Sequence, residues 1–103
     1  MKQLKIEIEN IEDANEIFEL AEHYDDIEMI QEKNFNGDIT IIELYISATI
    51  NIITIVSVVI KALIKEKKIS SLYIDGDKID IKNIPVELVE KIIDKKMNDK
   101  NVK

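Results

Sequence analysis

The chain of 103 residues contains no cysteine and no tryptophan, one proline, two glycines and one histidine. Without cysteine it forms no disulfide and offers no thiolate ligands to zinc or to an iron–sulfur cluster. Two glycines are too few for a dinucleotide fingerprint or a phosphate-binding loop. A single histidine excludes the usual zinc sites, in which several histidines share the metal. We therefore expect neither a metal nor a cofactor.

Arginine is absent as well, and 14 lysines against 21 acidic residues give a net charge of −7. This balance disfavours direct nucleic-acid binding, because the affinity of such proteins comes largely from neutralised phosphates. Residues 1–32 hold eleven acids and two lysines, a net charge of −9, so the other 71 residues carry the difference, +2. The acidic segment serves either solubility or docking onto a protein partner with a basic surface.

The length fits one domain, and we expect it to span residues 1–97, followed by a frayed tail over residues 98–103. No apolar signal-peptide core follows Met1 to Lys5, so we expect a cytoplasmic location.

The first elements are a strand and a helix. Residues 4–9 alternate between apolar and charged, which is the period of a half-buried strand. Asn10 is a typical N-cap, and the spacing that follows predicts a helix from Glu12 to Tyr24 with one apolar face. The opposite face carries our candidate partner-binding residues, which are Glu12, Glu16, Glu19 and Glu22.

The middle of the chain is the most apolar segment. A short strand is expected at Ile27–Ile30 and a loop at Asn34–Asp38. No charged residue occurs from Leu44 to Ile60. On a helical wheel, one sector collects the polar residues Glu43, Ser47, Asn51, Thr54, Ser57, Lys61, Lys65 and Lys68. A strand does not produce this spacing, so the segment predicts a long central helix. Its start is open, because residues 39–43 fit either the end of a strand or the first helical turn.

Such a helix has a wider apolar surface than one small sheet can cover. The remainder must contact other helices, a second copy of the chain, or lipid. The polar stripe argues against a membrane span, which needs about 20 predominantly apolar residues. We therefore expect no span. The helix is either buried at the centre of its own chain or completes its burial in a homodimer, the commonest closed assembly. Its interface is expected at Ile46, Ile53, Val56 and Ile60.

The last third of the chain predicts a hairpin and a helix. Two alternating runs between Ser71 and Ile81 flank Asp75-Gly76, a strong hairpin signal. Pro85 is suited to a first helical position and opens an amphipathic helix that ends near Met97. The order β-α-(β)-α-β-β-α indicates an α+β fold, with a small, mostly antiparallel sheet packed on the long central apolar helix.

Three segments follow one another in a characteristic order. They are the opening strand and helix (Leu4 to Tyr24), the uncharged segment ending in lysines (Leu44 to Lys68) and the hairpin (Leu72 to Asp77). In their order they resemble the effector-associated constant component family of bacterial conflict systems. The family's helix is rich in glycine and alanine and ends in arginine, whereas this segment is rich in isoleucine and ends in lysine. The resemblance implies a non-catalytic interaction module in bacterial immunity.

Two alternatives remain open. One is a small acidic inhibitor encoded by a phage, similar in size and charge to many anti-CRISPR proteins, which blocks a basic nucleic-acid groove of a host defence effector. The other is a carboxylate-based nuclease, which the single histidine and the lack of arginine and cysteine disfavour. No nucleophile–base pair is evident, so we expect a protein that is not an enzyme.

Overall fold

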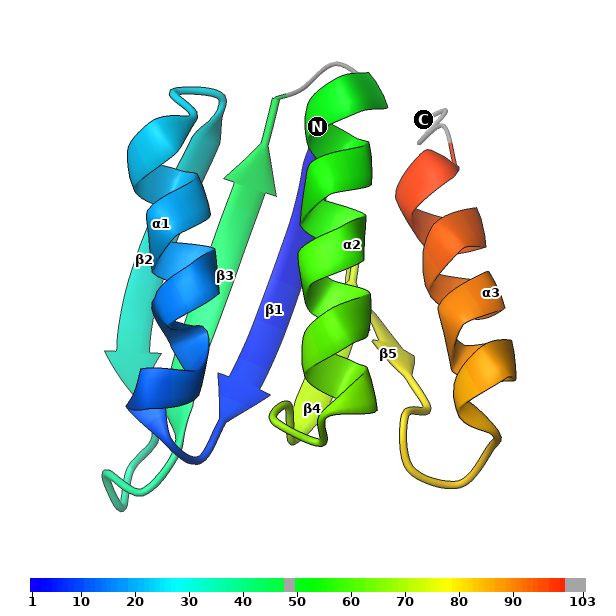
Figure 1. The fold of residues 1–103 in the computed structure, drawn as a ribbon. Helices are drawn as coiled ribbons and strands as arrows, with labels where there is room; N and C mark the ends of the chain where they lie inside the picture. The colour runs from blue at the N-terminus through cyan, green and yellow to red at the C-terminus, as the bar shows by residue number, and fades with distance from the viewer. Residues whose placement is uncertain (48–49, 100–103) are drawn as a thin grey trace.

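The fold is described by a computed structural model, which covers residues 1–47 and 50–99. Its elements are β1 (Lys2–Ile8), the 3-10 helix η1 (Ile11–Ala14), α1 (Asn15–His23), β2 (Ile27–Lys33), β3 (Thr40–Ile46), α2 (Ile50–Lys65), β4 (Ser71–Ile74), β5 (Asp77–Ile79) and α3 (Val86–Asn98). The strands form one sheet in the order β2-β3-β1-β4-β5, and every neighbouring pair is antiparallel. All three α-helices lie on one face of this sheet (Figure 1), so the predicted α+β class is confirmed.

The first six major elements, β1 to β4 with α1 and α2, follow the β-α-β-β-α-β order of the ferredoxin-like motif. Strand β5 extends the sheet beyond β4, and α3 packs beside α2 (Figure 1).

The core lies between the sheet and the helices. In β1 the residues Leu4, Ile6 and Ile8 are fully buried, whereas the alternating residues point to the other face. The register places Leu4 opposite Leu44 and Ile6 opposite Ile42 of β3. Helix α2 packs on this layer through its buried apolar residues, which are Val56, Ile60, Leu63 and Ile64. Because burial of one such side chain contributes about 1.5–3 kcal/mol, this layer is the main source of stability.

The first helix follows its sequence signals closely. The Asn10 side chain accepts a hydrogen bond from the Glu12 backbone N–H at 3.2 Å, which confirms its capping role. The chain then makes the single turn of η1 before α1 begins at Asn15. The predicted apolar face lies toward the core. Ile17 is buried, and four neighbours pack partly buried against the core: Phe18, Leu20, Ala21 and Tyr24.

The long central helix is shorter than predicted. Residues Thr40–Ile46 form strand β3, and α2 runs only from Ile50 to Lys65; residues 48 and 49 lie outside the described part of the chain. A strand end was one of two alternatives for residues 39–43, but the continuation of β3 to Ile46 was not foreseen, although burial in this strand alternates at every second residue. It pairs with β1 on one side and β2 on the other, and two complete hydrogen-bond ladders favour the extended form over helix.

Other boundaries also differ from expectation. Strand β2 runs to Lys33 rather than to Ile30, because it pairs along the whole of β3. Of the predicted polar stripe, Asn51 and Thr54 are exposed but Ser57 is buried. Within residues 1–47 and 50–99, no helix has both the length and the apolar character needed to cross a bilayer.

The C-terminal hairpin is confirmed. Leu72 pairs with Ile79, and the turn residues Asp75 and Gly76 have φ of 52° and 88°. Positive φ at both central positions is what a two-residue turn of this hand requires. The following loop is held by Asp80, whose carboxylate accepts hydrogen bonds from the backbone N–H groups of Asn83 and Lys82. These bonds lower the pKa of Asp80.

Two ion pairs connect the C-terminal helix α3 to α2 and to β5. Lys61 Nζ of α2 lies 2.8 Å from Asp94 Oδ1. Lys96 Nζ lies 2.9 Å from Asp77 Oδ2 of β5, and this bond and charge raise the pKa of Lys96. Asn98 is the last residue of α3, one residue beyond the predicted end of the helix near Met97. Residues 100–103 lie outside the described part of the chain.

Lys2 joins three distant segments. Its side chain is only 5% exposed. The ammonium donates to Asp75 Oδ2 at 2.8 Å, to the Lys96 carbonyl at 2.7 Å and to the Asp99 carbonyl at 3.0 Å. Asp75 Oδ1 in turn accepts from the Gln3 backbone N–H. Lys2 therefore links the start of β1 to the β4–β5 turn and to the C-terminal end of α3.

We predict that Lys2→Met lowers the free energy of unfolding by about 2–4 kcal/mol. Removing one partner of a buried ion pair costs roughly 3–5 kcal/mol, and Asp75, at 19% exposure, recovers part of this through water. Urea denaturation followed by circular dichroism measures the change. The matched control is Lys91→Met on the exposed side of α3, which should change stability by less than about 0.5 kcal/mol. Equal stability of the two variants would contradict this role of Lys2.

Candidate partner-binding groove

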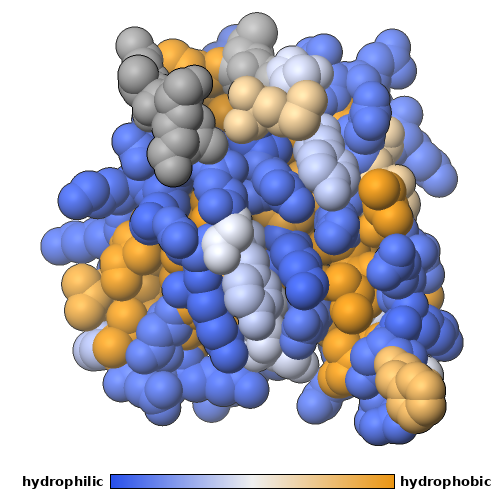
Figure 2. Space-filling view, turned by 180° about the vertical axis from the view of Figure 1, so that it is seen from behind, coloured by the Kyte–Doolittle hydropathy of each residue, from blue (hydrophilic) through white to orange (hydrophobic). Residues whose placement is uncertain are grey.

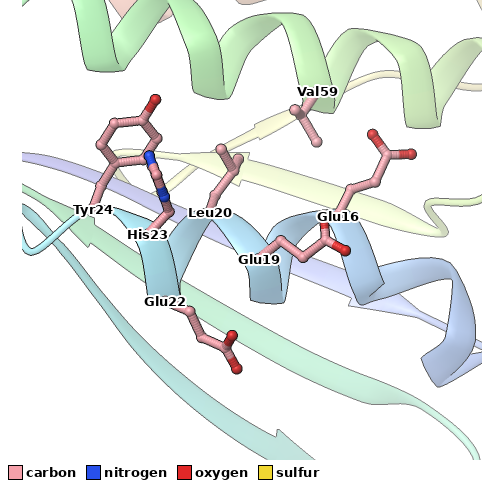
Figure 3. A pocket seen from close by; sticks show the side chains of 7 residues that line it. All are labelled: Glu16, Glu19, Leu20, Glu22, His23, Tyr24 and Val59. Carbon is pink, nitrogen blue, oxygen red and sulfur yellow. The ribbon is translucent and has the colours of Figure 1, made fainter.

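A groove of about 580 Å³ lies between α1 and α2. It is lined by Glu16, Glu19, Leu20, Glu22, His23, Tyr24 and Val59. Six of these residues come from α1 and its C-cap, and Val59 comes from α2. Figure 3 shows these side chains together with the two helices.

The helical period separates an apolar wall from an acidic rim. Leu20 and Tyr24 lie one turn apart and pack partly buried against the core. Val59 faces them from α2, and Figure 3 shows Leu20 and Glu16 directed toward that helix. The carboxylate of Glu22 points away from α2 in the same view, so it lies on the outer side of the rim.

The acids of the rim are exposed. None of the four salt bridges found among the described residues includes Glu16, Glu19 or Glu22. Their negative charge is therefore not neutralised by a neighbouring lysine at ion-pair distance within the described chain. Such a rim attracts cationic groups and raises their rate of encounter.

Three of the four predicted partner-binding residues line the groove. The fourth, Glu12, lies in η1 and is exposed, but it is outside the lining. His23, the single histidine of the chain, packs its ring edge-on against Tyr24, with ring centroids 4.7 Å apart and planes at 86°. The structure thus makes His23 part of the groove wall. Val59 was not predicted, because nothing in the sequence indicates which turn of one helix faces the other.

The groove combines carboxylates with aliphatic and aromatic surface, which suits basic and amphipathic ligands. Across residues 1–47 and 50–99, no three side chains of the histidine, cysteine, aspartate or glutamate type come together in a way that could hold a metal ion.

The residues predicted for a dimer interface lie in the core of the single chain rather than on its surface. Ile46, Val56 and Ile60 are fully buried inside a single chain, and Ile53 is partly buried. Ile46 also belongs to β3 rather than to the helix. Because these side chains already fill the chain's own core, Ile46, Val56 and Ile60 leave no surface for a second copy.

The exposed apolar surface lies elsewhere. On α2 it includes Ile50 and Val58, which are 76% and 57% exposed. The most exposed apolar side chain is Phe35, in the turn between β2 and β3, at 104%. Asn34 holds this turn by accepting hydrogen bonds from the backbone N–H groups of Asp38 and Ile39. The sequence signal for Phe35 was only its position between two asparagines in an expected loop.

Neither a family model, nor a curated protein, nor a solved structure matches this chain.

We predict that Ile60→Ala lowers the free energy of unfolding by about 2–5 kcal/mol, because it opens a cavity in the core. The loss should be the same at low and high protein concentration, since Ile60 packs within one chain. Val58→Asp, on the exposed side of the same helix, should change stability by less than about 1 kcal/mol. Thermal unfolding at two concentrations measures both. A concentration-dependent loss for Ile60→Ala would return this residue to an oligomer interface.

Proposed function

We propose that this protein is a non-catalytic interaction module of a bacterial conflict system that binds a basic protein segment in the groove between α1 and α2. One observation carries the proposal. Exposed carboxylates without lysine partners at ion-pair distance, within the described chain, rim a groove whose wall is formed by Leu20, Tyr24 and Val59.

The partner that fits is an amphipathic helix with basic residues along one edge. Side chains three and four residues apart on a helix are about 5–6 Å apart at Cβ. Lysines or arginines with that spacing on the partner match Glu16 and Glu19. An apolar residue between them then contacts Leu20 and Val59, which is the mode in which helices bind grooves.

The order of elements supports the assignment to conflict systems. A strand and acidic helix precede the apolar helix, which ends near the lysine cluster at residues 65–68, and the Asp75-Gly76 hairpin follows. An acidic inhibitor that blocks a basic nucleic-acid groove would use the same glutamates, so the two functions share this surface. Genomic neighbours separate them: an effector gene beside this one supports the module, and a surrounding prophage supports the inhibitor.

Self-association belongs to the same proposal, because a dimer would carry two grooves. Two linked sites raise the apparent affinity for a partner that has two basic segments. A cytoplasmic location is part of the same proposal.

We predict that Glu16→Lys combined with Glu19→Lys weakens binding of a synthetic lysine–leucine amphipathic peptide by about tenfold or more, a loss of ~1.4 kcal/mol. Isothermal titration calorimetry measures the affinity. Amide chemical shifts should move in α1 and at Val59 of the unmodified protein when peptide is added.

The matched control is Glu87→Lys combined with Glu90→Lys. It changes the charge by the same amount, and it also alters one glutamate in the first turn of a helix. The control should bind within about twofold of the unmodified protein. If both double variants lose affinity equally, or if the shifts map away from the groove, net charge alone explains the binding and the groove is not the site.

A further inference from the structure

The sheet face opposite the helices is open. Figure 2 views the molecule from this side, where hydrophilic side chains predominate in the middle and apolar atoms reach the surface toward both lateral edges. Antiparallel sheets commonly leave one face in solvent, and such a face alternates with the buried one along each strand. Here β1 contributes Gln3, Lys5 and Glu7 to the open face.

One row of residues crosses the whole open face. Cα pairing links Ile30 to Glu43, Glu43 to Lys5, Lys5 to Tyr73, and Tyr73 to Lys78. We call these five residues the central row. Ile30 and Lys78 are exposed, and the other three are half-buried.

The charge of the central row changes sign between β3 and β1. On the β2–β3 side, Glu43 is flanked by the exposed Glu28 and Glu32 of β2. On the β1–β5 side, Lys5 and Lys78 lie over the ring of Tyr73, with Nζ 5.1 and 6.0 Å from its centroid. Glu7 is an acid on the basic side, but it lies one row away, opposite Ile41 and Ser71.

Lys5 and Glu43 are directly opposite in the pairing of β1 with β3, yet none of the salt bridges among the described residues joins them. Lys5 lies toward Tyr73, and the Glu43 carboxylate accepts a hydrogen bond from the Tyr45 hydroxyl at 3.1 Å. This bond and the negative charge nearby raise the pKa of Tyr45. The Lys5 ammonium and the Glu43 carboxylate therefore do not form an ion pair with each other on the open face.

We propose that the open sheet face binds a second copy of this chain, sheet against sheet, with Lys5 of each copy facing Glu43 of the other. A two-fold axis parallel to the strands, between β1 and β3, places each β1 over the β3 of the second copy. The same axis brings Tyr73 over Ile30. An axis across the strands would instead put lysine on lysine and glutamate on glutamate, so the charge pattern selects one arrangement.

The arrangement satisfies the demands of a closed dimer. A two-fold interface uses the same patch on both subunits and must be complementary to itself, as the central row is. Facing sheets pack about 10 Å apart, a separation that lysine and glutamate side chains can bridge. The half-buried Tyr45, Tyr73 and Ile41 supply uncharged surface around the pair. The helices and their acidic groove remain outside. The inference therefore rests on the self-association part of the proposed function and gives it a surface, but it does not depend on the groove binding a basic segment.

The test is an exchange of charges. Lys5→Glu places two glutamates opposite each other in its own dimer, and Glu43→Lys places two lysines opposite each other. Each variant alone should dimerise at least about tenfold more weakly than the unmodified protein, equivalent to ~1.4 kcal/mol. In an equal mixture, both contacts become attractive again, and the heterodimer should form with close to the original affinity. Sedimentation velocity measures the dimers, and native mass spectrometry identifies the heterodimer.

Matched controls separate this contact from net charge, since a chain of −7 also repels itself. Lys91→Glu and Glu87→Lys on α3 make the same charge changes away from the open face and should dimerise like the unmodified protein. Circular dichroism establishes that the strand variants stay folded, because like charges opposite each other in a strand pair cost only ~0.2–1 kcal/mol.

Three outcomes overturn the inference. The first is an unmodified protein that remains monomeric at millimolar concentration. The second is a dimer unaffected by Lys5→Glu and Glu43→Lys but lost in Val58→Asp, which would place the interface on α2. The third is a mixture of the two strand variants that forms no heterodimer.

Discussion

The apolar face of the two central strands has to be shielded from water, and the rest of the fold follows from this requirement. Leu4, Ile6 and Ile8 of β1 have no exposed surface, and their partners in β3 are equally buried. The strand order makes β1 parallel to β2 and β3 parallel to β4, and parallel connections are almost always right-handed. Because the two connections run in opposite directions, the same hand places α1 and α2 on the same face of the sheet.

The parts of the fold that local chemistry determines could be predicted from the sequence. Asn10 supplies the cap, Asp75 and Gly76 supply the turn, and the apolar faces of α1 and α3 follow the helical period. The full length of strand β3 could not be found in this way, because a strand was only one of two alternatives for residues 39–43 and residues 44–46 were expected to be helical. Its residues are apolar on both sides of the period except for Thr40 and Glu43, and the spacing of the polar residues Glu43, Ser47 and Asn51 happens to fit a helix. Only pairing with β1 and β2, which the sequence does not reveal, distinguishes the two forms.

The difference between local periodicity and long-range packing also explains which parts of the candidate groove were predicted. The acidic rim could be predicted because Glu16, Glu19 and Glu22 follow the period of one local helix. The wall formed with Val59 could not, because it depends on how α1 and α2 pack across the sheet. The isoleucines assigned to an interface show the opposite error. Apolar character indicates that a side chain such as Ile46 or Ile60 is buried, but not whether its own chain or a second copy covers it.

Placing the helices on one face divides the surface into two chemically different sides. The helix side carries the unneutralised carboxylates of α1, whereas the open sheet side carries both signs, arranged by strand register. A surface of one sign cannot pair with a copy of itself, so the acidic helix suits a different, basic partner. A surface that carries both positive and negative groups can pair with a copy of itself when a two-fold axis places opposite charges against each other. In the proposed dimer, the register that aligns Lys5 with Glu43 would thus leave the acidic groove free for a partner while a second copy covers the opposite side.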